Sequence, residues 1–161
     1  MRREFGKVIV ELAEAHPELY LLVGDIGYRI FDEFRSKFPK RFLNMGICEQ
    51  SMISVAAGMA HEGIKPVVYT ITPFLIERPF EQVKLDIDEQ KSNVLLVGYA
   101  DYPYQGPTHS ELNNSGVMRQ LKNTPLYFPK DSIETRVMAS EAFIREGPAF
   151  MSLKEDKTLK K

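Results

Sequence analysis

Glu49 stands where an apolar run ends and a helix begins, in the segment NMGICEQSM (44–52). The helix expected over 47–62 is built mostly of small and apolar residues, which predicts that it is buried in the core or in an interface. An acid in a first helical turn gains roughly 0.3–1 kcal/mol from the helix dipole, and this structural role stays open for Glu49. A buried carboxylate nevertheless needs a partner, or it neutralises. Glu49 is therefore a candidate for contact with a ligand.

Three further candidates follow other apolar runs. Phe74 comes after Pro73 at the end of such a run, where its ring could face a ligand or join the core. Arg78 is either a ligand contact or a surface residue of the next helix. His109 lies in the segment QGPTHSE (105–111), after a Gly-Pro turn, and a loop histidine can act as an acid, a base or a donor near neutral pH.

Common catalytic and binding motifs are missing from the sequence. GDIG (24–27) lacks the spacing of a G-x-G-x-x-G fingerprint, and there is no Walker A loop. There is no G-x-S-x-G elbow and no Cys/His metal cluster, so no metal ligands are assigned. Cys48 is the single cysteine, which rules out an internal disulfide and favours a reducing compartment. We interpret it as a packing residue.

Composition narrows the functional classes. The chain has 161 residues, 43% of them hydrophobic, and 21 basic against 22 acidic residues give a net charge of −1. This balance does not favour nucleic acid or an anionic membrane as a partner. No apolar run reaches the roughly 20 residues of a membrane span, and the N-terminus lacks the apolar stretch of a signal peptide. We expect a soluble, cytoplasmic protein.

Short apolar runs alternate with helix-period segments along the whole chain. Most runs are continuous, which is typical of parallel strands covered on both faces. This pattern predicts a three-layer α/β/α fold with a mostly parallel, doubly wound sheet of about six strands, and the loops after strands one to four share one edge. We expect one domain, 1–153, and a charged, frayed tail, 154–161. The expected strands are 20–25, 41–45, 65–71, 93–99, 125–129 and 148–153, and the expected helices are 2–15, 29–37, 47–62, 79–90, 111–121 and 132–145.

Taken together, these segments resemble the pyrimidine-binding domain of transketolase, which 1-deoxyxylulose-5-phosphate synthases share. The resemblance covers roughly residues 18 to 153. GICEQ with its small-residue helix and GPTH after the fourth strand are its most specific parts. The segments that carry it are VGDIG, RFLNMGICEQSMISVAAGMAHEG, KPVVYTITPFLIERPFEQVKLDI, NVLLVGY, QGPTHSE and GPAFMSL.

The resemblance implies thiamine diphosphate as the cofactor and a role for each candidate. Glu49 would bond N1′ of the aminopyrimidine and favour the imino tautomer, whose 4′-nitrogen takes the proton from thiazolium C2. Phe74 would stack on the same ring, with Leu75 as the alternative. Asp25, at the end of the first strand, matches an acid near the cofactor. Ile47 and Arg78 are also assigned to the cofactor site.

His109 matches a histidine that contacts an oxygen of the sugar substrate. Gln105 stands where many transketolases have an aspartate that contacts a substrate hydroxyl, so the usual ketose substrates are in question. The implied reaction transfers a two-carbon ketol unit between sugar phosphates or related keto compounds.

A second departure concerns the diphosphate half of the cofactor site. The family's Gly-Asp-Gly motif with a downstream Asn, which holds Mg²⁺ and the diphosphate, is missing. We therefore expect a diphosphate-binding subunit or domain as partner, in a homodimer or heterotetramer. Two alternatives stay open: a non-catalytic binding or assembly module that kept the fold, and an unrelated doubly wound protein that binds a nucleotide.

Overall fold

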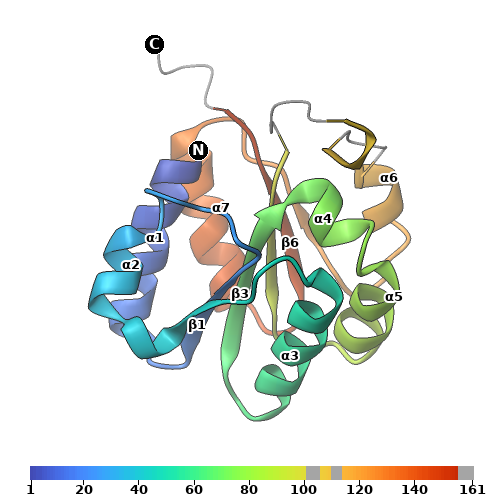
Figure 1. The fold of residues 1–161 in the computed structure, drawn as a ribbon, viewed down its shortest axis with the longest axis horizontal. Coiled ribbons are helices and arrows are strands. Elements are labelled where there is room, and N and C mark those ends of the chain that lie inside the picture. The colour runs from blue at the N-terminus through green and yellow to red at the C-terminus, as the bar shows by residue number, and fades with distance from the viewer. Residues whose placement is uncertain (101–105, 110–113, 156–161) are drawn as a thin grey trace.

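Six strands in the described part of the chain form a single sheet, and every pairing in it is parallel. The computed structural model describes residues 1–100, 106–109 and 114–155 (Figure 1). The parallel sheet confirms the predicted fold class. The strands are β1 (Leu19–Val23), β2 (Phe42–Asn44), β3 (Lys65–Ile71), β4 (Leu95–Tyr99), β5 (Leu126–Tyr127) and β6 (Ala149–Leu153).

The strand order β2-β1-β3-β4-β6-β5 fixes where a ligand is expected. The chain runs from β1 outward to β2, then crosses back to place β3 on the other side of β1. The winding direction thus reverses between β1 and β3. In open α/β sheets, ligands bind off the carboxyl ends of the strands at such a switch point. The loop that begins at Gly24 and the helix that begins at Thr72 leave the sheet at this point.

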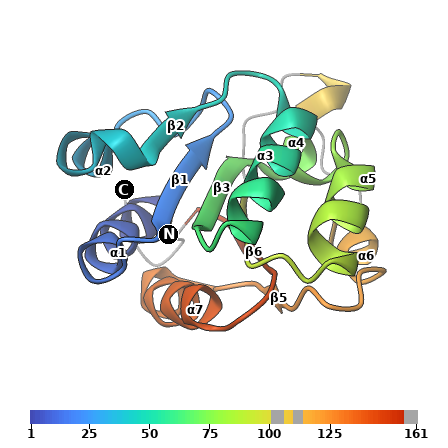
Figure 2. The same ribbon diagram turned by 90° about the horizontal axis from the view of Figure 1, so that it is seen from below.

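Three of the inner strands are buried along their whole length, which explains their continuous apolar sequence. Every residue of β3, β4 and β6 is buried. One hydrophobic core lies between the sheet and helices α1, α2 and α7, and a second lies between the sheet and helices α3, α4 and α6 (Figure 2). The helices are α1 (Arg2–Ala15), α2 (Asp32–Lys37), α3 (Glu49–His61), α4 (Thr72–Ile76), α5 (Phe80–Gln82), α6 (Asn114–Met118) and α7 (Ser132–Ile144).

Two segments differ from the prediction. Residues 72–78, expected as a loop, contain the helix α4, whose second residue is Pro73. A proline suits a first helical turn because its missing N–H would have no helical partner there. The helix expected over 79–90 is instead the short α5 followed by a π-helical segment, η2 (Val83–Glu89). Two 3₁₀ turns, η1 (Pro39–Arg41) and η3 (Pro107–His109), complete the described elements.

Within this chain helix α3 is buried on one face only, so it is not a core helix on every side, and its burial in an interface stays a prediction. Glu49, Met52, Ile53, Ala56 and Ala57 are buried against the sheet. The opposite face is exposed, and its apolar member Val55 is 42% exposed.

Among the described residues, no helix is both long and apolar enough to cross a membrane.

Candidate active site

Glu49 is the first residue of α3, and only 3% of it is exposed. The chain reaches it through a tight turn in which Gly46 has a φ of 73°, a conformation that favours glycine. The Nη1 atom of Arg78 donates to both carboxylate oxygens of Glu49, at 3.0 Å and 3.1 Å. The buried carboxylate therefore has the partner that burial demands, and the chain itself supplies it.

Phe74 lies in helix α4, and Arg78 lies in the turn that follows the end of this helix at Ile76. The Arg78 Cζ atom lies 3.4 Å from the centroid of the Phe74 ring. The guanidinium thus covers one face of the ring in a cation–π contact. The Arg78 side chain is 33% exposed, so this pair lies at the mouth of the site rather than in the core.

His109 joins the same group from the turn η3. Its ring centroid lies 4.8 Å from that of Phe74, with an angle of 65° between the ring planes. The Thr108 hydroxyl and His109 Nδ1 lie 3.1 Å apart, within hydrogen-bond distance. The structure therefore places His109, Phe74, Arg78 and Glu49 in one continuous row of contacts, drawn from three separate segments of the chain.

The structure also distinguishes Phe74 from its alternative, Leu75. Leu75 has no exposed surface and packs in the core between the sheet and α3. Phe74 is only half-buried and contacts Arg78 and His109. Of the two residues, only Phe74 has a ring at the sheet edge where a ligand is expected.

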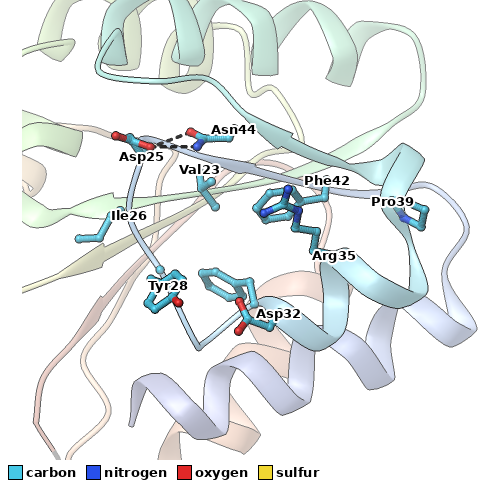
Figure 3. A pocket seen from close by; sticks show the side chains of 11 residues that line it. Val23, Asp25, Ile26, Tyr28, Asp32, Arg35, Pro39, Phe42 and Asn44 are labelled. Atoms are coloured by element: carbon cyan, nitrogen blue, oxygen red, sulfur yellow. Dashed lines mark hydrogen bonds between the residues drawn. The ribbon is translucent and has the colours of Figure 1, made fainter.

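Asp25 lies on the other side of the switch point, in an arrangement that the sequence pattern did not reveal. The Asn44 Oδ1 atom accepts from the backbone N–H groups of Asp25 and Gly46, each at 3.1 Å. The Asn44 Nδ2 atom donates to Asp25 Oδ1 at 3.0 Å (Figure 3). The bond to Gly46 is an Asx-turn, for which an asparagine two residues before a glycine is a recognisable signal. Asn44 therefore ties the loop after β1 to the loop that leads to Glu49.

An open groove of about 560 Å³ lies beside this pair of loops. Side chains from β1, β2 and α2 line it, as Figure 3 shows. Its polar members are Asp25, Tyr28, Asp32, Arg35 and Asn44.

The remaining predicted site residues lie apart from the row of contacts or outside the described residues. Ile47 is 74% exposed, two positions before Glu49. Gln105 lies outside the described residues. The thiol of Cys48 donates to the Met45 carbonyl oxygen at 2.7 Å, which agrees with a local structural role. Within the described part of the chain, no three His, Cys, Asp or Glu residues come together as metal ligands.

The row of contacts defines the chemistry of a ligand that could bind there. Glu49 offers a buried acceptor for N–H groups, and Phe74 offers a flat apolar face. A planar, nitrogen-containing ring satisfies both requirements. The residues present therefore fit an aminopyrimidine.

The fold and the site define the class of the protein as a doubly wound, parallel α/β domain with a buried acid at the start of the helix after its second strand. Comparison with known proteins makes the class specific. The model of the family described as "Transketolase, pyrimidine binding domain" matches residues 1–159, and the chain belongs to this family.

Named relatives agree with this assignment. The chain is 33% identical, over 147 residues, to a 1-deoxy-D-xylulose-5-phosphate synthase from Dictyoglomus thermophilum, covering 89% of the chain and 24% of the relative. It is 37% identical, over 123 residues, to an apulose-4-phosphate transketolase subunit from Actinobacillus succinogenes, covering 74% of the chain and 40% of the relative. A solved split-gene transketolase, an inactive beta4 tetramer, superposes with a TM-score of 0.84 at 31% identity. The superposition covers 96% of this chain and 51% of that structure's chain. The chain thus spans about half, or less, of each relative.

Proposed function

We propose that this chain is the pyrimidine-binding half of a thiamine-diphosphate-dependent, transketolase-like enzyme. The reaction would transfer a two-carbon ketol unit between sugar phosphates or related keto compounds. Membership of the family supports the cofactor, and the relative named as a transketolase subunit supports a divided enzyme. The observation that carries the proposal is the buried Glu49 carboxylate at the start of α3, which Arg78 links to the half-buried ring of Phe74.

In this proposal the residues of the chain bind and orient the cofactor ring. When bound, thiamine diphosphate supplies the carbon nucleophile that cleaves or forms a C–C bond next to a carbonyl. Glu49 accepts a hydrogen bond from a ring nitrogen in a site that excludes water, where such a bond is strong. Phe74 gives the ring a flat apolar surface. Asp25 and Ile47 complete the cofactor side of the site, where Arg78 lies against both Glu49 and Phe74.

The substrate side of the proposed site is formed by His109 and Gln105. His109 is suited to hold or donate a proton at an oxygen of the sugar, and its contact with Phe74, the proposed stacking residue, supports this role. Gln105 can donate or accept a hydrogen bond but carries no charge. A substrate other than the usual ketoses is therefore consistent with this residue.

The proposal requires a partner that binds the diphosphate and Mg²⁺, because the sequence lacks the motif for them. We take residues 1–153 as the pyrimidine-binding unit. The assembly would be a homodimer of this chain, or a heterotetramer with two partner subunits. Sedimentation of the chain with and without its partner tests this point, and a monomer under both conditions contradicts it.

Replacement of Glu49 by glutamine in the assembled complex tests the proposed function. Glutamine keeps the shape but removes the charge, so kcat should fall by at least about a hundredfold. Circular dichroism should show an unchanged fold. The matched control is Glu14→Gln, which alters an exposed acid paired with Lys37 on the other side of the sheet.

Full activity of Glu49→Gln would remove this residue from the mechanism. If, in addition, cofactor and Mg²⁺ had no effect on the assembled complex, the non-catalytic binding module would become the better interpretation.

A further inference from the structure

Arg78 makes both of the contacts that the proposed function assigns to the cofactor ring. Its Nη1 atom donates to the two oxygens of Glu49, and its Cζ atom lies 3.4 Å from the centre of the Phe74 ring. The first contact corresponds to a hydrogen bond from a ring nitrogen. The second corresponds to stacking of the ring on an aromatic face.

The guanidinium group is chemically suited to imitate an aminopyrimidine. It is planar and delocalised, carries N–H donors in its plane, and stacks on aromatic rings. An aminopyrimidine is likewise planar, and in its imino tautomer N1′ carries an N–H donor in the plane of the ring. A subsite built for one of these groups therefore accepts the other.

The two groups cannot hold the same positions together. One nitrogen of Arg78 contacts both carboxylate oxygens of Glu49, and the guanidinium carbon lies over the Phe74 ring. A ring bonded to Glu49 and stacked on that face of Phe74 would overlap the guanidinium. We infer that Arg78 occupies the pyrimidine subsite of the ligand-free chain and that the cofactor ring displaces it; this inference rests on the proposed function.

The location of Arg78 allows such an exchange. Its side chain is 33% exposed, whereas that of Glu49 is 4% exposed, so the arginine can leave toward solvent while the acid stays in place. The arginine also keeps the buried carboxylate paired before the ring arrives. Because only the fraction of molecules with an open subsite can bind, the contact lowers the apparent affinity for the ring.

The first experiment uses the wild-type chain and thiamine as the probe. The ring current of Phe74 should shift the NMR signals of the Arg78 side chain, and Phe74→Leu identifies this shift by removing it. Saturating thiamine should return the Arg78 signals to the positions of a free arginine. Signals that stay unchanged while thiamine is bound would overturn the inference.

The second experiment compares the affinity for thiamine among variants. Arg78→Ala opens the subsite, so we expect it to bind thiamine about tenfold more tightly than the wild type. Arg78→Lys keeps the charge but lacks the planar group. Its affinity for thiamine should lie between those of the wild type and Arg78→Ala. The control is Arg136→Ala, because Arg136 pairs with Glu4 and Glu11 on the other face of the sheet. Equal or weaker binding by Arg78→Ala would contradict displacement.

Chemical rescue separates the two ways in which the inference could fail. Ethylguanidinium should raise the melting temperature of Arg78→Ala, but not of the wild type, and should compete with thiamine. If thiamine binds the wild type at least as tightly as Arg78→Ala, the proposed function stands and only displacement is wrong. In another outcome, ethylguanidinium rescues Arg78→Ala but thiamine binds neither the wild type nor Arg78→Ala. Both the assignment of a pyrimidine subsite and the displacement of Arg78 by the ring are then wrong. If Arg78→Ala does not fold, the wild-type NMR experiment decides.

Discussion

Two buried carboxylates of this chain are satisfied in different ways, and the difference separates a site residue from a structural one. Glu49 is paired with one side chain, Arg78, which is a third exposed and can move. Asp88, 2% exposed, accepts from the backbone N–H groups of Lys122 and Asn123 and from the Thr124 hydroxyl. Backbone donors cannot leave without unfolding the loop. Asp88 therefore holds the segment before β5 and is not available to a ligand.

Replacement of Asp88 by alanine tests this structural role. It leaves two N–H groups and one hydroxyl without their acceptor, so the free energy of unfolding should fall by about 3 kcal/mol. Urea denaturation measures the loss. The control is Asp86→Ala, since Asp86 bonds Ser54 at an exposed position and its loss should cost less than about 0.5 kcal/mol. Equal losses in the two variants would contradict the assignment.

At the scale of the elements, the N-terminus of α7 shows which hydrogen bonds of a capping-box sequence form. Residues 131–134, Asp-Ser-Ile-Glu, have the sequence of a capping box, and the structure forms half of it. Asp131 Oδ1 accepts from the backbone N–H of Glu134 at 2.8 Å. The carboxylate of Glu134 accepts from the N–H of Lys130 rather than from that of Asp131. The stabilising interaction of the cap is thus the one made by Asp131.

Replacement of Asp131 by alanine should destabilise the chain by about 1 kcal/mol, because an orphan N–H of the first turn loses its acceptor. For a chain of this length the melting temperature should fall by about 2–4 °C. Differential scanning calorimetry gives the shift. Ser140→Ala, in the middle of the same helix, serves as the control. A shift no larger than that of the control would show that the cap does not contribute.

At the scale of the whole molecule, Lys65 links pH to stability. It lies at the start of β3, is 7% exposed, and donates to the Arg145 carbonyl oxygen at the end of α7, at 2.7 Å. Burial lowers the pKa of Lys65 below its ordinary value, and the charge of Arg145 acts in the same direction, while Glu18 and Glu146 oppose it. The unfolded chain therefore holds this proton more tightly than the folded chain.

The free energy of unfolding should consequently rise with pH as Lys65 loses its proton in the folded state, up to the unfolded pKa of about 10.4. At neutral pH both states are protonated and the full cost of burying the charge is present. Urea denaturation of the wild type and of Lys65→Met between neutral pH and about pH 10.5 measures the difference. The wild type should gain stability relative to the variant as pH rises. A constant difference would contradict the prediction.

Much of the fold could be predicted from the sequence, because continuous apolar runs and helical periodicity depend on residues close together in the chain. The helix α4 within residues 72–78 was not predicted, because it depends on packing between the end of β3 and the neighbouring elements. Asn44 was missed for a related reason. Its Asx-turn is local, but its bonds to Asp25 depend on the parallel pairing of β1 with β2.

The sequence by itself determined the fold class and the candidate site residues Glu49, Phe74, Arg78 and His109. It also determined that a buried Glu49 would need a partner, because burying an unpaired charge is costly in any fold. Only the tertiary structure decided that this partner is Arg78, that Phe74 rather than Leu75 contacts Arg78, and that His109 reaches the same ring. These contacts join segments far apart in the chain. They depend on the angle at which α3, α4 and η3 meet the sheet, which local periodicity does not specify.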